Sequence, residues 1–438
     1  MRIAFATVGC RLNQFETDAL RGKAEAGGFV IVPFAEEADV YVINTCTITA
    51  EADADSRQLV RRAVRKNPTA VVAVTGCYAQ AAPERAAEIP GVDLVLGNVE
   101  KAALFQHLRE ARPTGSARIR VADISGQRRV DGDEYGPGID PDRTRAFLKV
   151  QDGCSYACSF CIVPTVRGPN RSLPADRILS EIRRLAAAGF PEVVLTGIHL
   201  GTYGRDLDPR TSLTDLCARI ADLPEAPRVR LSSLDPHEVG PDLIRLLAAS
   251  PRFCRHLHLP LQSGDDAVLE RMRRTHTAMQ FRALVERLVA EIPGIAVTAD
   301  VIVGFPGEDE AAFQRTYDLL AALPIAGLHV FRFSPRAGTE AADYPGQPPR
   351  AVKAARSRAL RALAAEKALT FRRGFLGETL ELAVLHRDRS DGMLEGLSDN
   401  YLKVWFPGNA ALRGRLCRVQ IRALAEGGLL GQCCGIVD

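Results

Sequence analysis

Three cysteines in one short run are the residues of this 438-residue chain best suited to chemistry. Cys154, Cys158 and Cys161 form a Cys-x3-Cys-x2-Cys pattern, and no other Cys or His lies within twenty residues on either side. Three thiolates on one loop can hold three irons of a cubane cluster and leave the fourth iron open. A structural zinc ion would need a fourth ligand, which this run lacks. An open iron suits a cluster that binds and reduces a small molecule.

A second set of three cysteines is spread over the first 80 residues. Cys10, Cys46 and Cys77 are 36 and 31 residues apart, so they do not form a local metal-binding loop. Each closely follows a short β-rich run, and parallel strands that end at one sheet edge can bring such thiols together. The alternative is three buried small residues, because free cysteine is common in protein cores. The other five show no such placement and are interpreted as structural: Cys217, Cys254, Cys417, Cys433 and Cys434.

The patterns around these cysteines predict an α/β protein of three domains. Residues 1–112 alternate β-rich and helical runs, which predicts a parallel sheet flanked by helices. Residues 113–140 are rich in Gly, Pro, Asp and Arg and are predicted to be a linker or long surface loop. Residues 141–373 contain six strand-like runs separated by helices and end in a basic helix. One of the separating segments is predicted to be helical over 265–292. This pattern predicts a partial (β/α)6 barrel. Residues 374–438 predict a small antiparallel β-barrel.

Polar and glycine residues follow the predicted barrel strands, where such barrels place their active-site groups. Glycine at these ends lets the backbone approach a ligand closely, although each residue alone is also typical of an ordinary turn. They are Thr196 and Gly197, Ser232 and Ser233, Gln262 and Ser263, and Gly304.

Together these features resemble the radical S-adenosylmethionine (SAM) methylthiotransferase family, which has a three-cysteine domain, a radical SAM barrel and a C-terminal TRAM barrel. The resemblance implies SAM and two 4Fe–4S clusters, and it implies that the strand-end residues and Phe160 contact SAM. In that family SAM is reduced to release a 5′-deoxyadenosyl radical, which abstracts hydrogen from a C–H bond that offers no acid–base handle. Sulfur associated with the N-terminal cluster attacks that carbon, and a second SAM provides the methyl group. The implied cluster ligands are Cys10, Cys46 and Cys77, and Cys154, Cys158 and Cys161.

Two runs, Gly9–Thr17 and Asn44–Thr49, resemble the branch of the family that modifies C2 of N6-threonylcarbamoyladenosine beside the tRNA anticodon. The isopentenyl-adenosine branch typically has Gln-Met-Asn after its first Cys, and the branch that modifies a ribosomal-protein aspartate has Pro-Lys-Asn; neither is present. Those two branches are the enzymatic alternatives, and a zinc-stabilised RNA-binding protein is the non-enzymatic one. The expected partners are the tRNA anticodon stem-loop, SAM, a low-potential electron donor and a sulfur source.

Basic residues near the C-terminus favour RNA binding independently of the resemblance. Residues 350–373 carry a net charge of +7 in a chain of net charge +3, which favours phosphate contact, although most such runs are solvated helix faces. In the run 401–406, period-2 alternation predicts a strand with one apolar face. Its other face would carry two aromatics and a lysine, which suit base stacking and phosphate contact. The alternative is a strand packed on both faces. The candidate RNA contacts are Arg356, Arg361, Tyr401, Lys403, Trp405 and Arg415. Further candidate phosphate contacts are Arg61, Arg62, Arg65, Lys66, Arg271, Arg273 and Arg274.

The chain shows neither a secretory leader nor a run of eighteen apolar residues. With eleven cysteines and no regular pairing pattern, reduced thiols are expected. We therefore expect a cytoplasmic protein with no membrane partner.

Overall fold

The computed structural model forms two compact units. The first consists of the described residues in 1–130, 151–157 and 161–172, and the second of those in 143–150, 158–160 and 173–437. The structure describes residues 1–111, 116–130, 143–386, 389 and 391–437.

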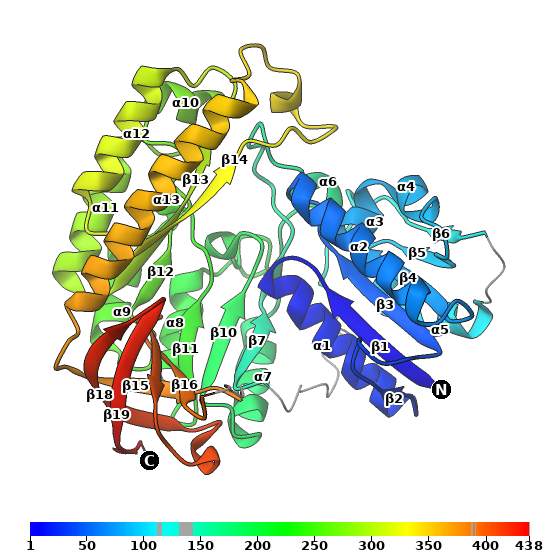
Figure 1. The fold of residues 1–438 in the computed structure, drawn as a ribbon, viewed down its shortest axis with the longest axis horizontal. Helices are drawn as coiled ribbons and strands as arrows, with labels where there is room; N and C mark the ends of the chain where they lie inside the picture. The colour runs from blue at the N-terminus through cyan, green and yellow to red at the C-terminus, as the bar shows by residue number, and fades with distance from the viewer. Residues whose placement is uncertain (112–115, 131–142, 387–388, 390, 438) are drawn as a thin grey trace. The chain divides into compact units, whose positions relative to one another are not determined.

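The first unit is built on a parallel sheet with the strand order β2-β1-β3-β4-β5-β6 (Figure 1). Apolar residues of α1 and α5 pack on one face of this sheet, and those of α2, α3 and α4 pack on the other. The predicted sheet flanked by helices is therefore confirmed. The elements are β1 Arg2–Thr7, α1 Arg11–Ala26, β2 Val30–Ile31, β3 Val40–Thr45, α2 Ala50–Lys66, β4 Val71–Gly76, α3 Cys77–Ala81, α4 Pro83–Ala87, β5 Leu94–Leu96, α5 Leu104–Glu110 and β6 Arg118–Arg120.

Two further segments complete this unit. Strand β6 comes from the stretch 113–140, which was expected to be a linker, and it pairs with β5 as the last strand of the sheet. Residues 112–115 and 131–142 lie outside the described part of the chain. The cysteine loop begins at β8 (Gln151–Asp152), which pairs with β9 (Arg171–Ser172), and helix α6 (Val163–Arg167) lies between them.

The second unit contains the predicted parallel barrel strands in two three-stranded sheets, β11-β10-β7 and β12-β13-β14. This arrangement confirms the expected partial barrel. Its elements are β7 Arg145–Lys149, α7 Ala175–Ala187, β10 Glu192–Thr196, α8 Leu213–Ala221, β11 Arg228–Leu231, α9 Pro241–Ala249, β12 His256–His258, α10 Asp266–Arg271, α11 Ala278–Glu291, β13 Ala296–Val303, α12 Glu310–Ala322 and β14 Gly327–Arg332.

The single helical segment expected over 265–292 is wrong, because two helices, α10 and α11, form there. Arg273, between them, has a positive φ of 55°, which a continuing helix does not allow. Thr277 then starts α11 with a capping box, in which its hydroxyl accepts from the Gln280 N–H and the Gln280 side chain accepts from the Thr277 N–H.

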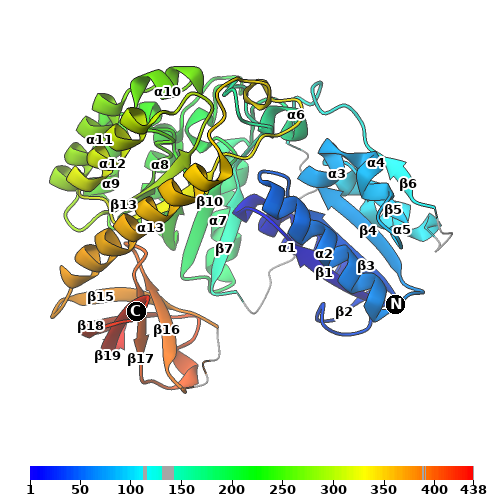
Figure 2. The same cartoon turned by 45° about the horizontal axis from the view of Figure 1, so that its top comes forward.

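A long basic helix, α13 (Arg350–Arg373), leads into a closed C-terminal β-barrel (Figure 2). The strand order is β15-β16-β17-β19-β18, and the expected small barrel is confirmed. One pair, β17 with β19, is parallel, whereas the other pairs are antiparallel. The strands are β15 Thr379–Val384, β16 Leu394–Ser398, β17 Lys403–Phe406, β18 Leu416–Ala425 and β19 Gly428–Ile436.

A buried ion cluster attaches the C-terminal β-barrel to the base of the parallel barrel. Glu192, on β10, accepts hydrogen bonds from Arg230 Nε at 2.8 Å and Arg228 Nε at 2.9 Å. The remaining donors of both arginines reach backbone carbonyls of the C-terminal β-barrel at 2.7–3.1 Å, those of Glu381, Leu397, Ser398 and Asp399.

Within the described ranges, the structure has no helix that combines the length and the apolar character needed to span a membrane.

Candidate metal centres and active site

The three N-terminal cysteines all lie at the carboxyl end of the first unit's sheet. Cys10 follows β1 and is the N-cap residue of α1, Cys46 follows β3, and Cys77 comes directly after β4 as the first residue of α3. These three strands are neighbours in the sheet. The topology therefore brings together three thiols that are separated by more than thirty residues in the sequence.

Two glycines allow close packing around these thiols. A Cβ at Gly9, where φ is +117°, would lie 2.8 Å from Cys46 Cβ and 3.2 Å from its Sγ. A Cβ at Gly76, where φ is +96°, would lie 2.4 Å from Asn44 Oδ1. Both separations are shorter than van der Waals contact, so side chains at these positions would push the cysteine-bearing loops apart.

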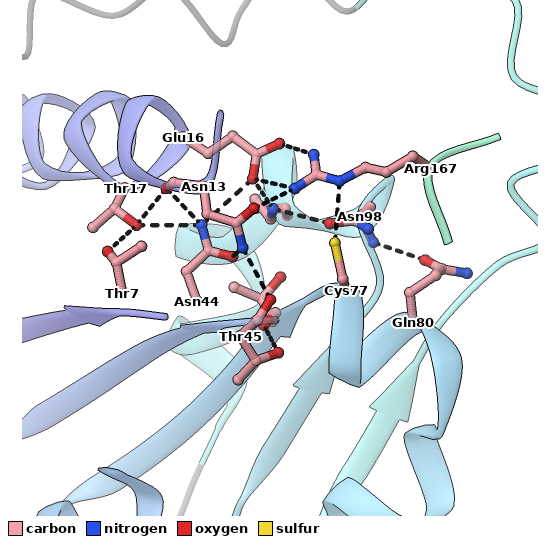
Figure 3. A network of polar contacts seen from close by, with 12 residues as sticks. Thr7, Asn13, Glu16, Thr17, Asn44, Thr45, Cys77, Gln80, Asn98 and Arg167 are labelled. Carbon is pink, nitrogen blue, oxygen red and sulfur yellow. Dashed lines mark hydrogen bonds and ion pairs between the residues drawn. The ribbon is translucent and has the colours of Figure 1, made fainter. Parts of the chain in front are cut away.

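A buried polar network lies beside these thiols, and Figure 3 shows it at Cys77. Arg167, at the end of α6, donates from Nε to Cys77 Sγ at 3.2 Å and from Nη2 to Asn13 Oδ1 at 2.8 Å, and its Nη1 pairs with Glu16. The Cys10 thiol lies 3.3 Å from the same Asn13 oxygen. Asn13 is held in place because its amide nitrogen donates to the Thr45 carbonyl at 3.0 Å.

All eleven cysteines carry free thiols, and Cys46 and Cys77 are buried whereas Cys10 is exposed. Burial, and to a smaller extent the neighbouring Cys77, raises the pKa of Cys46 to about 12. Burial opposes the charge of Arg167, but Cys77, Glu16 and Asp152 raise its pKa well above the usual value. A coordinated metal removes the proton from such a thiol outright. Three free thiols beside a fixed cation therefore fit an iron–sulfur cluster held by thiolates.

The run that carries Cys154, Cys158 and Cys161 makes contacts within each unit. In the first unit, the Cys154 N–H donates to the Gly168 carbonyl at 3.0 Å, and Ile162, which follows Cys161, packs against Cys77. In the second unit, Arg274 Nη1 lies 3.5 Å from Cys158 Sγ, and Arg274 also pairs with Asp235. Arg274 was expected to contact phosphate, but its side chain is only 8% exposed and is used in these contacts.

Two of the strand-end residues fit a ligand site. The hydroxyl oxygens of Thr196 and Ser232 are buried without a hydrogen-bond partner among the described residues. Thr196 is the last residue of β10, Ser232 follows the neighbouring strand β11, and the Ser232 N–H donates to the Leu195 carbonyl at 3.1 Å. Buried hydroxyls are normally paired, so these two have capacity for a ligand. Gly197, Ser233 and Gln262 are half-buried.

The other strand-end candidates have contacts inside the protein. The Ser263 hydroxyl accepts from the Asp265 N–H at 3.2 Å and lies 3.3 Å from Thr316 Oγ1, so it ties the strand end to α12. The Gly304 N–H donates to Glu308 Oε1 at 2.8 Å. Phe160 packs edge-to-face on Phe305, with 6.4 Å between the ring centroids.

The candidate RNA contacts divide into exposed and buried residues. Arg361 and Arg415 are exposed, and the Lys403 side chain is 43% exposed. Arg356 is 6% exposed, and its guanidinium pairs with Glu308 at 2.7 Å and Glu310 at 3.0 Å. These ion pairs occupy the Arg356 side chain, so the structure does not support its expected contact with phosphate.

The two aromatic candidates are also packed. Tyr401 precedes β17 with a φ of 67°, stacks on His256 at 4.6 Å between ring centroids, and lies under Arg230. Trp405 is 8% exposed, and its indole N–H donates to Glu395 at 3.2 Å. The alternation of this run is correct for its apolar face, which joins the barrel core. On its other face Trp405 is packed, as in the alternative considered above, whereas the Lys403 side chain is 43% exposed.

No sequence pattern pointed to a third polar cluster, formed by His258, Asp300 and His329 on the neighbouring strands β12, β13 and β14. Both imidazoles lie 3.1 Å from the same Asp300 oxygen. Burial of Asp300 opposes its ionisation, but hydrogen bonds from His258 and His329 lower its pKa to about 2. The spacing of His256 and His258, and of Thr298 and Asp300, two residues apart on their strands, is the signal that could have revealed this polar face.

Two family models match the chain. One, described as Uncharacterized protein family UPF0004, covers residues 2–97, and the other, the Radical SAM superfamily, covers residues 148–320. A solved structure of the radical SAM methyltransferase TsrM from Kitasatospora setae aligns with a TM-score of 0.55 at 20% identity, over 76% of this chain and 74% of that one, which shows a shared fold.

Full-length relatives are more similar. Two relatives are named threonylcarbamoyladenosine tRNA methylthiotransferase MtaB, one from Bacillus subtilis and one from Aquifex aeolicus, and each is 38% identical to this chain. Both alignments cover 96% of this chain; they cover 93% of the Bacillus subtilis protein and 100% of the Aquifex aeolicus protein. A tRNA-2-methylthio-N(6)-dimethylallyladenosine synthase from Moorella thermoacetica is 33% identical over 95% of this chain and 94% of its own length. With this identity over nearly its whole length, the chain belongs to the family of radical SAM methylthiotransferases, enzymes that use SAM and 4Fe–4S clusters.

Proposed function

We propose that this enzyme adds a methylthio group to C2 of N6-threonylcarbamoyladenosine next to the anticodon of tRNA. The observation that carries the proposal is the convergence of Cys10, Cys46 and Cys77 at one sheet edge, in addition to the Cys154–Cys161 run, because sulfur insertion needs more than one cluster site. The names of the Bacillus subtilis and Aquifex aeolicus relatives support this substrate.

In this proposal each cysteine triad holds one 4Fe–4S cluster, and the cluster on the Cys154–Cys161 run supplies, when loaded, the electron that cleaves SAM. The chain fixes that run through Ser159, whose hydroxyl donates to the Arg271 carbonyl at 2.8 Å and whose N–H donates to the Met272 carbonyl at 3.2 Å. We expect Thr196 and Ser232 to contact SAM, because their buried hydroxyls have no hydrogen-bond partner among the described residues.

Exposed basic side chains would bind the tRNA backbone. Arg361 on α13 and Arg415 before β18 are exposed, and the Lys403 side chain on β17 is 43% exposed. The reaction also needs a low-potential electron donor and a sulfur source, and we place it in the cytoplasm. We assign the sulfur-inserting site to the domain 1–112, the radical SAM site to 141–373, and RNA binding to 374–438 together with α13.

The test is to incubate the anaerobically reconstituted enzyme with SAM, a reductant and one of three substrates: tRNA carrying N6-threonylcarbamoyladenosine, tRNA carrying isopentenyl-adenosine, or the ribosomal protein. Mass spectrometry of the digested nucleosides, and of the peptides from the ribosomal protein, should show a methylthio product only with the first substrate. Modification of only one of the other two substrates would refute the proposal. Nucleoside analysis of tRNA from cells lacking the gene should show loss of the same product.

A further inference from the structure

Arg167 is a buried cation that touches the N-terminal thiol site directly. It is 1% exposed, and its Nε donates to Cys77 Sγ at 3.2 Å (Figure 3). Through Asn13, whose side-chain oxygen accepts from Arg167 and lies 3.3 Å from Cys10 Sγ, the same guanidinium is linked to a second thiol. A single side chain therefore orients two of the three sulfur atoms.

The sequence position of Arg167 makes this contact informative. Arg167 lies six residues after Cys161 and ends α6, so it comes from the segment that carries the radical SAM cysteines and not from the N-terminal domain. Apolar contacts of Ile162 and Val166 with Cys77 hold α6 against the site. The N-terminal thiol site is thus completed by a residue from the other cysteine segment.

Among the described residues, the ion pairs that join Arg167 to its buried neighbours contain one more cation than carboxylate. Five buried side chains are joined by ion pairs: Glu16 pairs with Arg167 and with Lys101 at 2.5 Å, and Asp152 lies 3.6 Å from Arg167 and 3.4 Å from Arg171. Three cations face two carboxylates in this set. An excess positive charge in a low-dielectric interior favours an anion beside it, and a cluster held by three thiolates is anionic.

We propose that Arg167 is a positioning residue that holds the Cys77 sulfur and raises the reduction potential of the cluster bound by Cys10, Cys46 and Cys77. This inference rests on the proposed function, which places a cluster there. Reduction adds negative charge to the cluster, and a hydrogen bond from a cation to a ligand sulfur stabilises that charge. Removing the guanidinium should therefore make the cluster harder to reduce.

The experiment is a redox titration followed by electron paramagnetic resonance. The parent is the full chain with Cys154, Cys158 and Cys161 changed to Ala, so that only the N-terminal cluster contributes. In this parent, Arg167→Gln should retain about four irons per chain and lower the midpoint potential. A tenfold weaker reduction equilibrium corresponds to a shift of about 59 mV for one electron.

Lys101→Gln is the matched control, because Lys101 is 4% exposed, pairs with the same Glu16 and directs its ammonium group to Glu16 and Asn98. Its shift should be clearly smaller than that of Arg167→Gln. Arg167→Lys keeps a cation but loses the planar fork, so its potential should lie between those of the parent and Arg167→Gln.

The results distinguish failure of the proposed function from failure of the role proposed for Arg167. A parent that binds no cluster at all would refute the proposed function. A parent-like potential in Arg167→Gln, or in Arg167→Lys if the Gln variant does not fold, would overturn the role of Arg167. Loss of the cluster in an otherwise folded Arg167→Gln would contradict the expected retention of about four irons and would overturn the proposal that Arg167 sets the potential of an intact cluster.

Discussion

Changing Glu192 to Gln should strongly destabilise the second unit. The Glu192 carboxylate is fully buried and pairs with Arg228 at 2.7 Å and with Arg230 at 2.8 Å, and these arginines are 6% and 0% exposed. Gln keeps the shape but removes the charge, and two guanidinium groups then remain buried without their carboxylate. Breaking a buried ion pair from one side costs about 3–5 kcal/mol.

The chain's single tryptophan provides the assay. Trp405 is buried in β17 of the C-terminal β-barrel, which is attached to the Glu192 cluster through Arg228 and Arg230. Its emission wavelength during heating therefore reports on the element that the substitution should loosen. At roughly 2–4 °C per kcal/mol, a loss of about 3–5 kcal/mol lowers the midpoint by about 6–20 °C.

Glu286→Gln is the control, because Glu286 forms an exposed pair with Arg282 at 3.6 Å, and such pairs contribute little. Equal melting of the Glu192 and Glu286 variants would refute the reasoning.

The effect of Glu192→Gln should also depend on pH. Burial alone would raise the pKa of Glu192, but Arg230 and Arg228 hold it well below its usual range. A lowered pKa contributes stability above the unfolded value of about 4.3, and that stability is lost as the pH falls towards the folded value. The difference between Glu192→Gln and the unchanged chain should therefore be constant from neutral pH down to about pH 5 and should narrow at lower pH.

Three further predictions concern the site and the basic helix. Cys154→Ala should abolish SAM cleavage to 5′-deoxyadenosine, measured by chromatography. Cys10→Ala should keep that cleavage and stop sulfur insertion. Cleavage at the unchanged rate in Cys154→Ala would contradict the assignment of the Cys154–Cys161 run to SAM cleavage. Arg361→Glu should weaken tRNA binding and reduce its salt slope by about one or more, measured by filter binding at several salt concentrations, and unchanged affinity would make Arg361 an ordinary solvated residue. Arg356→Glu should instead lower the melting midpoint, because it places an acid against Glu308 at a cost of about 3–5 kcal/mol. A melting midpoint equal to that of Arg361→Glu would show that the buried pair of Arg356 and Glu308 contributes little to stability.

Much of the cysteine arrangement could be predicted because it depends on topology alone. Cys10, Cys46 and Cys77 each follow a β-rich run, and a parallel sheet brings the ends of its strands to one edge. The role of Arg167 could not be predicted, because its partners Cys77 and Glu16 are 90 and 151 residues away in the sequence. Contacts over such distances depend on how α6 packs, and no local pattern encodes that packing.

The side-chain orientations assumed for Arg356 and Tyr401 differ from the structure, because charge and periodicity were counted without knowing which way each side chain faces. Arg356 contributes to the +7 of its helix, yet Glu308 and Glu310 neutralise it in the interior. Tyr401 was expected to share a strand face with Trp405, but β17 begins only at Lys403, and the positive φ of Tyr401 turns its ring towards His256. Both errors arise from tertiary contacts.

The attachment of the C-terminal β-barrel has an evolutionary consequence. The donors that Arg228 and Arg230 direct towards that barrel end on main-chain carbonyls and not on its side chains. Since every amino acid carries a carbonyl group, substitutions at the four accepting positions preserve these bonds as long as the backbone keeps its course. The part of the anchorage that Arg228 and Arg230 provide thus tolerates sequence change in the barrel, whereas the pair of Arg255 with the Asp399 side chain at 2.6 Å depends on that residue. A chimera carrying the C-terminal β-barrel of a distant relative should retain these four hydrogen bonds to main-chain carbonyls.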